Sequence, residues 1–255
     1  MPYSPDTSGG QELRFEDNRL LALFPDHVKE AIKPHAELVH LEAGDVLFRS
    51  GEDISHTYFP YAPTMLSLLV DLDDRRRVEV ASIGAEGAIG GIVSCGELPA
   101  YTRAQVQVAG AALRAPHDKI EQLKSESPFL RNLYCRYADY LLAQVMQSVA
   151  CNAFHPIEAR AARWLLTAQD RSGSRLELTQ EALAGLLGVQ RTTVNAVARE
   201  LQDDGLINYS RGVITVTDRE ELKHRSCECY EQVERHFKAV LGGESFDWIG
   251  HCEDQ

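Results

Sequence analysis

The chain has 255 residues, of which 44% are hydrophobic and 25% are charged. These proportions are ordinary for a globular protein and exclude a disordered, collagen-like or disulfide-stapled chain. The net charge of −12 excludes coating of nucleic acid by overall charge, so any contact with DNA must come from a local basic surface. No apolar run approaches the ~18 residues of a membrane span, so we expect no membrane partner.

The first part of the chain predicts a β-rich domain. Residues 1–19 lack a basic segment followed by an apolar one, which predicts a flexible start and a cytoplasmic protein. Short helices interrupted by prolines follow, and from about residue 42 to 114 short apolar runs alternate with turn residues. Such spacing is typical of an antiparallel sandwich or roll. We therefore expect a β-roll with flanking helices over residues 20–127, and an α+β fold for the whole chain.

A long helix is predicted over residues 128–155. After Pro128 the segment contains neither glycine nor proline, and its apolar residues recur every three or four positions. This stripe fits either a core helix or a seam between two copies of the chain, and the length of the helix favours the seam. The predicted dimer residues are Leu130, Leu133, Tyr137, Leu141, Val145 and Val149. His155-Pro156 should end the helix, which places a hinge near residues 152–156.

Residues 156–225 predict a winged helix-turn-helix. A short strand over 176–178 is followed by Thr179, a suitable N-cap for a helix over 180–187. Gly188 makes a tight turn, because glycine accepts the positive φ that such a turn requires. A second helix begins at Gln190 and ends near Gly205, and a hairpin then extends to residue 216. Helix, glycine turn, polar-fronted helix and hairpin occur in this order in winged helices.

The start of the second helix carries side chains suited to the major groove. Arg191 can pair with guanine O6 and N7, and glutamine or asparagine can pair with adenine. The predicted base contacts are Gln190, Arg191, Thr192, Thr193 and Asn195. The predicted phosphate contacts, which position the protein without reading sequence, are Thr179, Gln180, Arg199, Ser210 and Arg211. A helical hairpin used only for protein packing would leave this gathering of polar residues unexplained.

The Gly51-Glu52 pair, the long helix and the segment LTQEALAGLLGVQRTTVNAVARELQDDGLINYSRGVITV together resemble the Crp/Fnr superfamily of bacterial transcription regulators. The resemblance covers roughly residues 20–225. It implies a homodimer joined by paired long helices, a cyclic-nucleotide-binding-like roll that senses an effector, and a palindromic site on double-stranded DNA. RNA polymerase is a further expected partner. Thr192 and Ala196 stand where the cyclic-AMP receptor protein has glutamate and arginine, so its base preference does not transfer.

The residues that would hold a cyclic nucleotide depart from the family pattern. Gly91 stands where the resemblance implies a ribose-binding glutamate, and Thr102-Arg103 replaces the Arg-Ser pair in reversed order. If Ala104 and Val106 face the core, Arg103 points away from the phosphate position. We place a predicted effector pocket at Gly90, Gly91, Thr102 and Arg103, but the pattern argues against cyclic AMP or cyclic GMP. No cofactor is predicted, and haem is left open.

The six cysteines are expected to be reduced thiols, because no export signal precedes them. The first is Cys95, so the N-terminal iron–sulfur cluster of the oxygen-sensing branch is not expected. The segment 226–255 is predicted as a tail helix with a flexible end, and the tail contains His224, Cys227, Cys229, His251 and Cys252. The spacing matches no zinc signature, and residues two apart on a helix point away from each other, so no metal site is predicted.

A second hypothesis nevertheless rests on these residues. The chain would then be a metal- or redox-responsive interaction protein using the C-terminal cysteines and histidines, with little specific DNA binding. Cys151, near the hinge, is a further candidate redox position.

Enzyme chemistry is not predicted. A cupin-like metal enzyme needs two or three histidines and a carboxylate converging inside the barrel, but only His40 and His56 lie in or beside the early strands. The sequence also contains no G-x-S-x-G, Walker or H-E-x-x-H motif.

Overall fold

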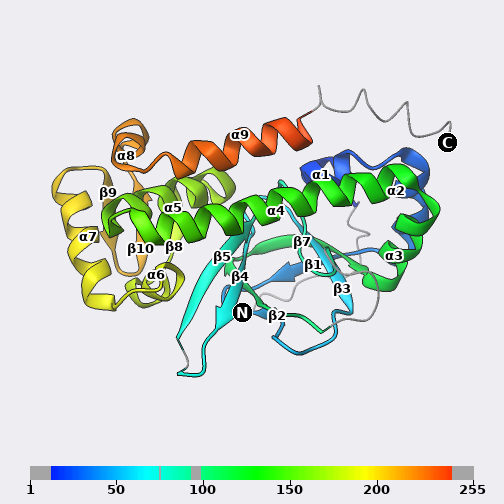
Figure 1. Ribbon diagram of the computed structural model, residues 1–255, viewed down its shortest axis with the longest axis horizontal. Coiled ribbons are helices and arrows are strands. Elements are labelled where there is room, and N and C mark those ends of the chain that lie inside the picture. The colour runs from blue at the N-terminus through cyan, green and yellow to red at the C-terminus, as the bar shows by residue number, and fades with distance from the viewer. Residues whose placement is uncertain (1–12, 75, 93–98, 243–255) are drawn as a thin grey trace, which may run out of the picture.

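Two antiparallel sheets form a β-roll at one end of the molecule (Figure 1). The computed structural model describes residues 13–74, 76–92 and 99–242. One sheet has the strand order β1-β7-β3 and the other β2-β6-β4-β5. The strands are β1 Glu37–Leu41, β2 Val46–Phe48, β3 His56–Pro60, β4 Met65–Asp71, β5 Arg77–Ile83, β6 Arg103–Val108 and β7 Gly110–Pro116. The predicted α+β fold class is confirmed.

Alternation along β6 decides which side chains face the roll core. Ala104 and Val106 are fully buried, as expected from the sequence. Arg103 therefore points away from the core, and its Nε donates to Asp71 Oδ2 at 2.9 Å. Arg103 is therefore paired with the carboxylate of Asp71, the last residue of β4.

Short helices close the roll. They are the 3-10 turns η1 Phe15–Asp17 and η2 Lys33–His35, and the helices α1 Arg19–Ala22, α2 Asp26–Ile32 and α3 His117–Glu126. The buried Asn18 caps α1 by accepting hydrogen bonds from the amides of Leu20 and Leu21. Its Nδ2 donates to the carbonyls of Pro60 and Gly87 at 3.0 and 2.8 Å, which attaches α1 to the roll.

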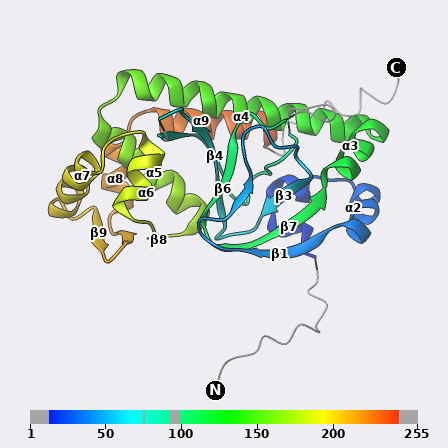
Figure 2. The same cartoon turned by 90° about the horizontal axis from the view of Figure 1, so that it is seen from below.

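The long helix α4, Pro128–Phe154, runs along the molecule from the roll to the C-terminal helices (Figures 1 and 2). The stripe predicted as a dimer seam mostly faces the protein's own core. Leu130, Leu133, Tyr137 and Leu141 are buried among the roll residues. The Tyr137 hydroxyl also donates to the Ala88 carbonyl and accepts from the Ala88 amide, both at 2.8 Å. For these four residues the alternative of a core helix is correct, because they cover apolar side chains of the roll that water would otherwise reach.

A different face of α4 is exposed and apolar. Leu142, Met146 and Val149 have exposed fractions of 50%, 61% and 66%. Val145 is half-buried beside them, and Cys135 is exposed further up the helix. The exposed positions 135, 142, 146 and 149 are separated by seven, four and three residues, the spacing of a coiled-coil seam.

The C-terminal part of the chain packs around a second apolar core. Its elements are α5 Ile157–Ser172, β8 Arg175–Glu177, α6 Gln180–Leu187, α7 Arg191–Asp203, β9 Ile207–Ser210, β10 Val213–Val216, α8 Arg219–Arg225 and α9 Cys229–Leu241. The three strands form one sheet in the order β8-β10-β9. No helix in the described ranges has the length and apolarity to cross a lipid bilayer.

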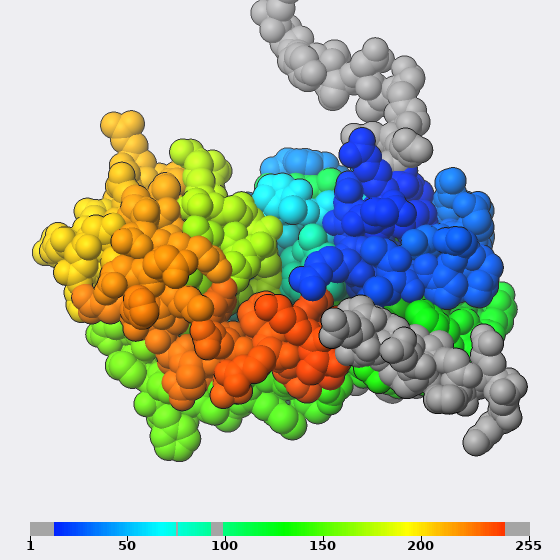
Figure 3. All heavy atoms as spheres, turned by 90° about the horizontal axis from the view of Figure 1, so that it is seen from above, coloured from blue at the N-terminus to red at the C-terminus, as the bar shows by residue number. Residues whose placement is uncertain are grey.

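The last helix, α9, returns along α4 and reaches the roll (Figures 1 and 3). Phe237 and Leu241 are buried in the roll core. The Phe237 ring packs edge-on against Tyr140, with ring centroids 4.9 Å apart, and the Arg19 guanidinium lies 4.3 Å from its centroid. This helix therefore joins the two cores rather than lying free of them.

Buried polar side chains connect α5 to the roll. Arg171 contacts Glu86 through Nη2 at 2.7 Å and donates from Nη1 to Ser82 Oγ at 2.7 Å. Further along β5, Trp164 Nε1 donates to Glu79 Oε1 at 2.8 Å, and Ser67 Oγ donates to Oε2 of the same carboxyl. These bonds fix α5 against β5.

Burial raises the pKa of the Glu79 carboxyl, although hydrogen bonds from Ser67 and Trp164 act in the opposite direction. The folded state therefore binds the proton more tightly than the unfolded state. The contribution of Glu79 to stability is largest at low pH and is lost as pH rises from about 4.3, the unfolded value, through the folded pKa.

We expect Glu79→Gln to gain stability relative to the parent protein as pH rises from 5 to 8. The amide keeps an acceptor for Trp164 and carries no charge, so the difference should grow by up to about 1.4 kcal/mol per pH unit within the titration window. Urea unfolding at both pH values measures it, with Glu30→Gln on the exposed side of α2 as the matched control. A difference between parent and variant that is constant with pH would contradict this assignment.

Candidate nucleic-acid interface

The first helix of the predicted motif, α6, begins as the sequence predicted. Thr179 is the N-cap, and its Oγ1 accepts from the Ala182 amide at 3.1 Å. A short polar side chain satisfies a helix-start amide that would otherwise have no partner. The exposed Thr179 is thus placed at the edge of the module.

The turn between α6 and α7 depends on Gly188, which adopts φ +67 and ψ 35. Its amide donates to the carbonyls of Ala184 and Gly185, and the Val189 amide donates to the Ala184 carbonyl at 3.0 Å. These are the bonds of a left-handed helix end. A Cβ at position 188 would also lie 3.2 Å from Val78 Cγ2 of β5.

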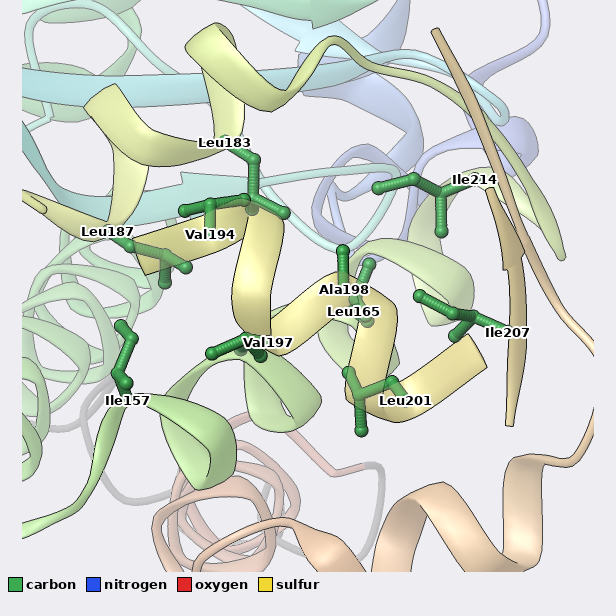
Figure 4. Close-up of a pocket in the computed structure, with 11 residues that line it drawn as sticks. Ile157, Leu165, Leu183, Leu187, Val194, Val197, Ala198, Leu201, Ile207 and Ile214 are labelled. Carbon is green, nitrogen blue, oxygen red and sulfur yellow. The ribbon is translucent and has the colours of Figure 1, made fainter. Parts of the chain in front are cut away.

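An apolar face holds α7 against the rest of the module (Figure 4). Val194, Val197, Ala198 and Leu201 point toward side chains of α5, α6 and the hairpin. The space left between them is only about 10 Å³, about one water molecule at most. The face of α7 that carries the polar residues is therefore the one turned away from the core.

The predicted base contacts lie on this outward face. Gln190, Arg191, Thr192 and Asn195 are exposed, whereas Thr193 is half-buried. Gln190 is the N-cap and makes no side-chain cap bond within the described residues. Figures 1 and 2 place α7 at the end of the molecule away from α2 and α3.

Two residues predicted for different contacts are joined in the structure. Gln180 Nε2 donates to Asn195 Oδ1 at 3.0 Å, which connects the start of α6 to the outward face of α7. The backbone N–H of Gln180 donates to the Tyr209 hydroxyl of β9 at 3.1 Å. Gln180 therefore orients Asn195, a role that the sequence did not indicate.

The wing is a two-residue hairpin between β9 and β10. Ser210 pairs with Val213, and Arg211 and Gly212 between them have φ values of +50 and +79. Two successive positive φ values match the right-handed twist of a hairpin. The turn projects the exposed Arg211 and Ser210 at its tip.

The charges of α7 are divided along its length. Two arginines of α7, Arg191 and Arg199, form no ion pair within the described ranges, and neither does Arg211 of the wing. Glu200 of α7 and Asp204 at its C-cap are paired instead with Arg225 of α8, whose Nη1 lies 3.5 Å from Glu200 Oε1 and whose Nη2 contacts Asp204 Oδ2. Residues 156–217 have a net charge of zero, so the unpaired arginines of α7 and the wing are the cations that this module offers to DNA.

The β4–β5 hairpin lies beside this surface. An open groove of about 690 Å³ runs between it and α6, with Arg76 and Arg77 on the roll side. Thr179 and Gln190 line the opposite side. Part of the predicted DNA-contacting surface is thus adjacent to the β-roll.

The predicted effector pocket is not formed at the two glycines. A Cβ at Gly91 would overlap the His117 ring, and one at Gly90 would overlap the His56 carbonyl. Both glycines have positive φ values and allow close packing of the loop on β3 and α3. Thr102 is half-buried, and Arg103 already has a carboxylate partner in Asp71.

The sequence predicted that Cys227 and Cys229 lie on one helix and point away from each other, and this prediction was wrong. Cys227 precedes α9 and Cys229 is its first residue, so the two are not on one helix. Their sulfurs converge with Cys151 and with His155, for which the sequence predicted only the end of a helix. His224 is exposed on α8, and His251 and Cys252 lie outside the described residues.

Comparison with known proteins agrees with this geometry. Residues 159–225 match the family model of the Crp-like helix-turn-helix domain. The chain carries a Crp-like helix-turn-helix domain. A curated relative, the HTH-type transcriptional regulator Cmr of Mycobacterium tuberculosis (strain CDC 1551 / Oshkosh), is 26% identical over 153 residues, or 60% of this chain. The match spans 62% of the length of that relative.

Solved structures share the fold. FixK2 of Bradyrhizobium japonicum is 16% identical with a TM-score of 0.63, covering 75% of this chain and 98% of its own. The c-di-GMP responsive global regulator CLP of Xanthomonas campestris is 16% identical with a TM-score of 0.61, covering 76% and 100%. A Crp/Fnr-family regulator of Thermus thermophilus is 19% identical with a TM-score of 0.59, covering 74% and 98%. The fold expected from the resemblance to the Crp/Fnr superfamily is confirmed, and the Cmr relative and the Thermus thermophilus protein are described as transcriptional regulators.

Two glycines three residues apart should respond oppositely to the same change. Gly188→Ala should cost about 1–2 kcal/mol, because an L side chain is strained at positive φ. Gly185→Ala should gain about 0.5–1 kcal/mol, because Gly185 lies in α6 and a Cβ there meets nothing within 4 Å. Urea unfolding of both variants measures the difference, and effects of equal sign would contradict the turn geometry.

Proposed function

We propose that this protein is a sequence-specific, DNA-binding transcription regulator of the Crp/Fnr type, cytoplasmic and without enzymatic activity. The observation that carries the proposal is the outward face of α7, where exposed groove-suited side chains surround cations that form no ion pair within the described residues. Gln190, Arg191, Thr192, Thr193 and Asn195 read base edges. Thr179, Gln180, Arg199, Ser210 and Arg211 hold phosphates. RNA polymerase is the further protein partner.

The regulator acts as a homodimer that binds a palindromic site. The dimer seam is the exposed apolar face of α4 centred on Leu142, Met146 and Val149. It keeps Val145 and Val149 of the stripe predicted from the sequence and leaves out the four residues of that stripe that are buried against the roll. Such a face is costly in water and is covered when two α4 helices pair. The pair would present two α7 helices to half-sites about 34 Å apart.

Control by an effector acts through the roll. The β4–β5 hairpin contacts α6, and Val78 of β5 lies beside the Gly188 turn. A movement of this hairpin would therefore change the orientation of α7. It would also change how accessible Thr179 and Gln190 are to DNA. A ligand that binds the two settings unequally would change DNA affinity.

Replacing Arg191 tests the base-reading role. We expect Arg191→Ala to weaken binding to the selected site by about 1–3 kcal/mol and to relax one base position, because a bidentate contact to guanine is lost. Site selection from genomic fragments followed by titration with matched and mismatched duplexes measures both effects. Equal losses on the selected site and on random duplex would refute base reading by Arg191.

Arg199→Ala should behave differently. It should weaken binding to all duplexes alike and reduce the salt slope by about 1, because one phosphate contact is removed. Arg49→Ala, an exposed arginine of the roll, is the matched control and should change neither quantity. An unchanged salt slope in the Arg199 variant would count against a phosphate contact there.

The seam is tested on the surface of α4. Leu142→Glu should raise the dimer dissociation constant by about 100-fold or more, since two unpaired carboxylates per dimer would be buried. Sedimentation equilibrium measures it, and binding to a two-fold symmetric site should weaken in parallel. Leu72→Glu is the matched control, because Leu72 is similarly exposed, at 47%, but lies beyond β4. A variant at Leu142 that dimerises like the parent protein would exclude this seam.

A further inference from the structure

Four potential metal ligands from three separate segments converge beside the hinge. Cys151 comes from the last turns of α4, His155 from the connection to α5, and Cys227 and Cys229 from the α8–α9 junction. Their sulfur and nitrogen atoms all lie within 4.8 Å of one another. The three cysteines are buried, with at most 7% of any of these residues exposed.

The distances suit a single tetrahedral ion. Cys151 Sγ lies 3.6 Å from Cys227 Sγ, and Cys229 Sγ lies 3.4 Å from His155 Nδ1. Zinc–sulfur and zinc–nitrogen bonds of about 2.3 and 2.0 Å place neighbouring ligands of a tetrahedron ~3.5–3.8 Å apart. An iron–sulfur cluster binds its cysteines through different iron atoms and spreads them more widely. Three thiolates and one imidazole are a donor set typical of structural zinc.

The side chains around the four ligands also fit an ion. His155 Nε2 lies 3.3 Å from Glu228 Oε2, so the carboxylate can accept from the imidazole and leave Nδ1 free to coordinate. Gln147 Nε2 donates to Cys229 Sγ at 3.0 Å. A hydrogen bond of this kind favours a thiolate over a thiol.

Charge is balanced around the cluster. Arg160 and Arg163 interact electrostatically with the cysteines. A divalent ion with three thiolates and a neutral imidazole carries a net charge of −1, which these guanidinium groups offset.

We propose that Cys151, His155, Cys227 and Cys229 form a tetrahedral zinc site that joins the end of α4, the hinge and the start of α9. His155 lies two residues before α5. The ion would therefore fix the direction in which the C-terminal module leaves the long helix. This mechanical consequence for DNA binding rests on the proposed function, whereas the metal site itself does not.

The test measures metal in the full-length protein, purified with a reductant and without chelators. Elemental analysis should find one zinc ion per chain, and replacement by Co²⁺ should give the intense visible bands of a tetrahedral, thiolate-bound ion. Cys227→Ser should abolish stoichiometric zinc. Cys135→Ser, an exposed cysteine elsewhere on α4, should retain it.

Loss of zinc in Cys227→Ser could also result from unfolding, so two substitutions nearer the surface serve as a second test. Glu228→Gln should weaken zinc about 10- to 100-fold in competition with a chromophoric chelator, and His155→Ala should weaken it further, both with unchanged circular dichroism. These readouts do not involve DNA, so a protein that binds zinc but no specific duplex would overturn the proposed function and not the site.

Three results of the metal measurements would overturn the site. The first is wild-type protein that contains no zinc and shows no visible bands after Co²⁺ is added. The second is full zinc affinity in Cys227→Ser, and the third is several iron atoms per chain after anaerobic purification. A Cys151–Cys227 disulfide in the reduced, metal-exposed preparation would likewise assign the pair to redox chemistry.

Discussion

The packing of α4 on the roll is the constraint from which the rest of the structure follows. Tyr137 fills the space above Gly87 and bonds both backbone groups of Ala88, so the helix is fixed in rotation as well as in position. Once Leu133 and Tyr137 face the core, Leu142 and Met146 must face outward. A 27-residue helix thus completes one hydrophobic core and still offers a second apolar surface, which a monomer would leave in water.

Local features of the DNA-binding module could be predicted because their causes are local. Thr179 caps α6 and Gly188 adopts positive φ for reasons contained within a few residues. The polar start of α7 is visible for the same reason, since helical periodicity separates Val194 and Val197 from the outward residues.

Features that depend on distant segments could not be predicted. Periodicity located the stripe on α4 but could not say whether the roll or another chain covers it. His155 gave no signal, because its partners at positions 227 and 229 are more than seventy residues away and approach only when α9 turns back along α4. The bond from Gln180 to Asn195 is missed in the same way, since it needs the angle between two helices.

Contacts of different chemistry hold α5 against the roll and fix the point where it leaves α4. On the roll side of α5, Arg171 and Trp164 bond to Glu86 and Glu79 in a buried polar contact. At the other end of α5, the Cys151 cluster brings α4 and α9 together just before the helix begins. Polar bonds have strict geometry, so a shift of β5 must either break them or carry α5 with it. Because α5 packs against α7 through Leu165, the movement would reach the exposed residues that begin at Gln190.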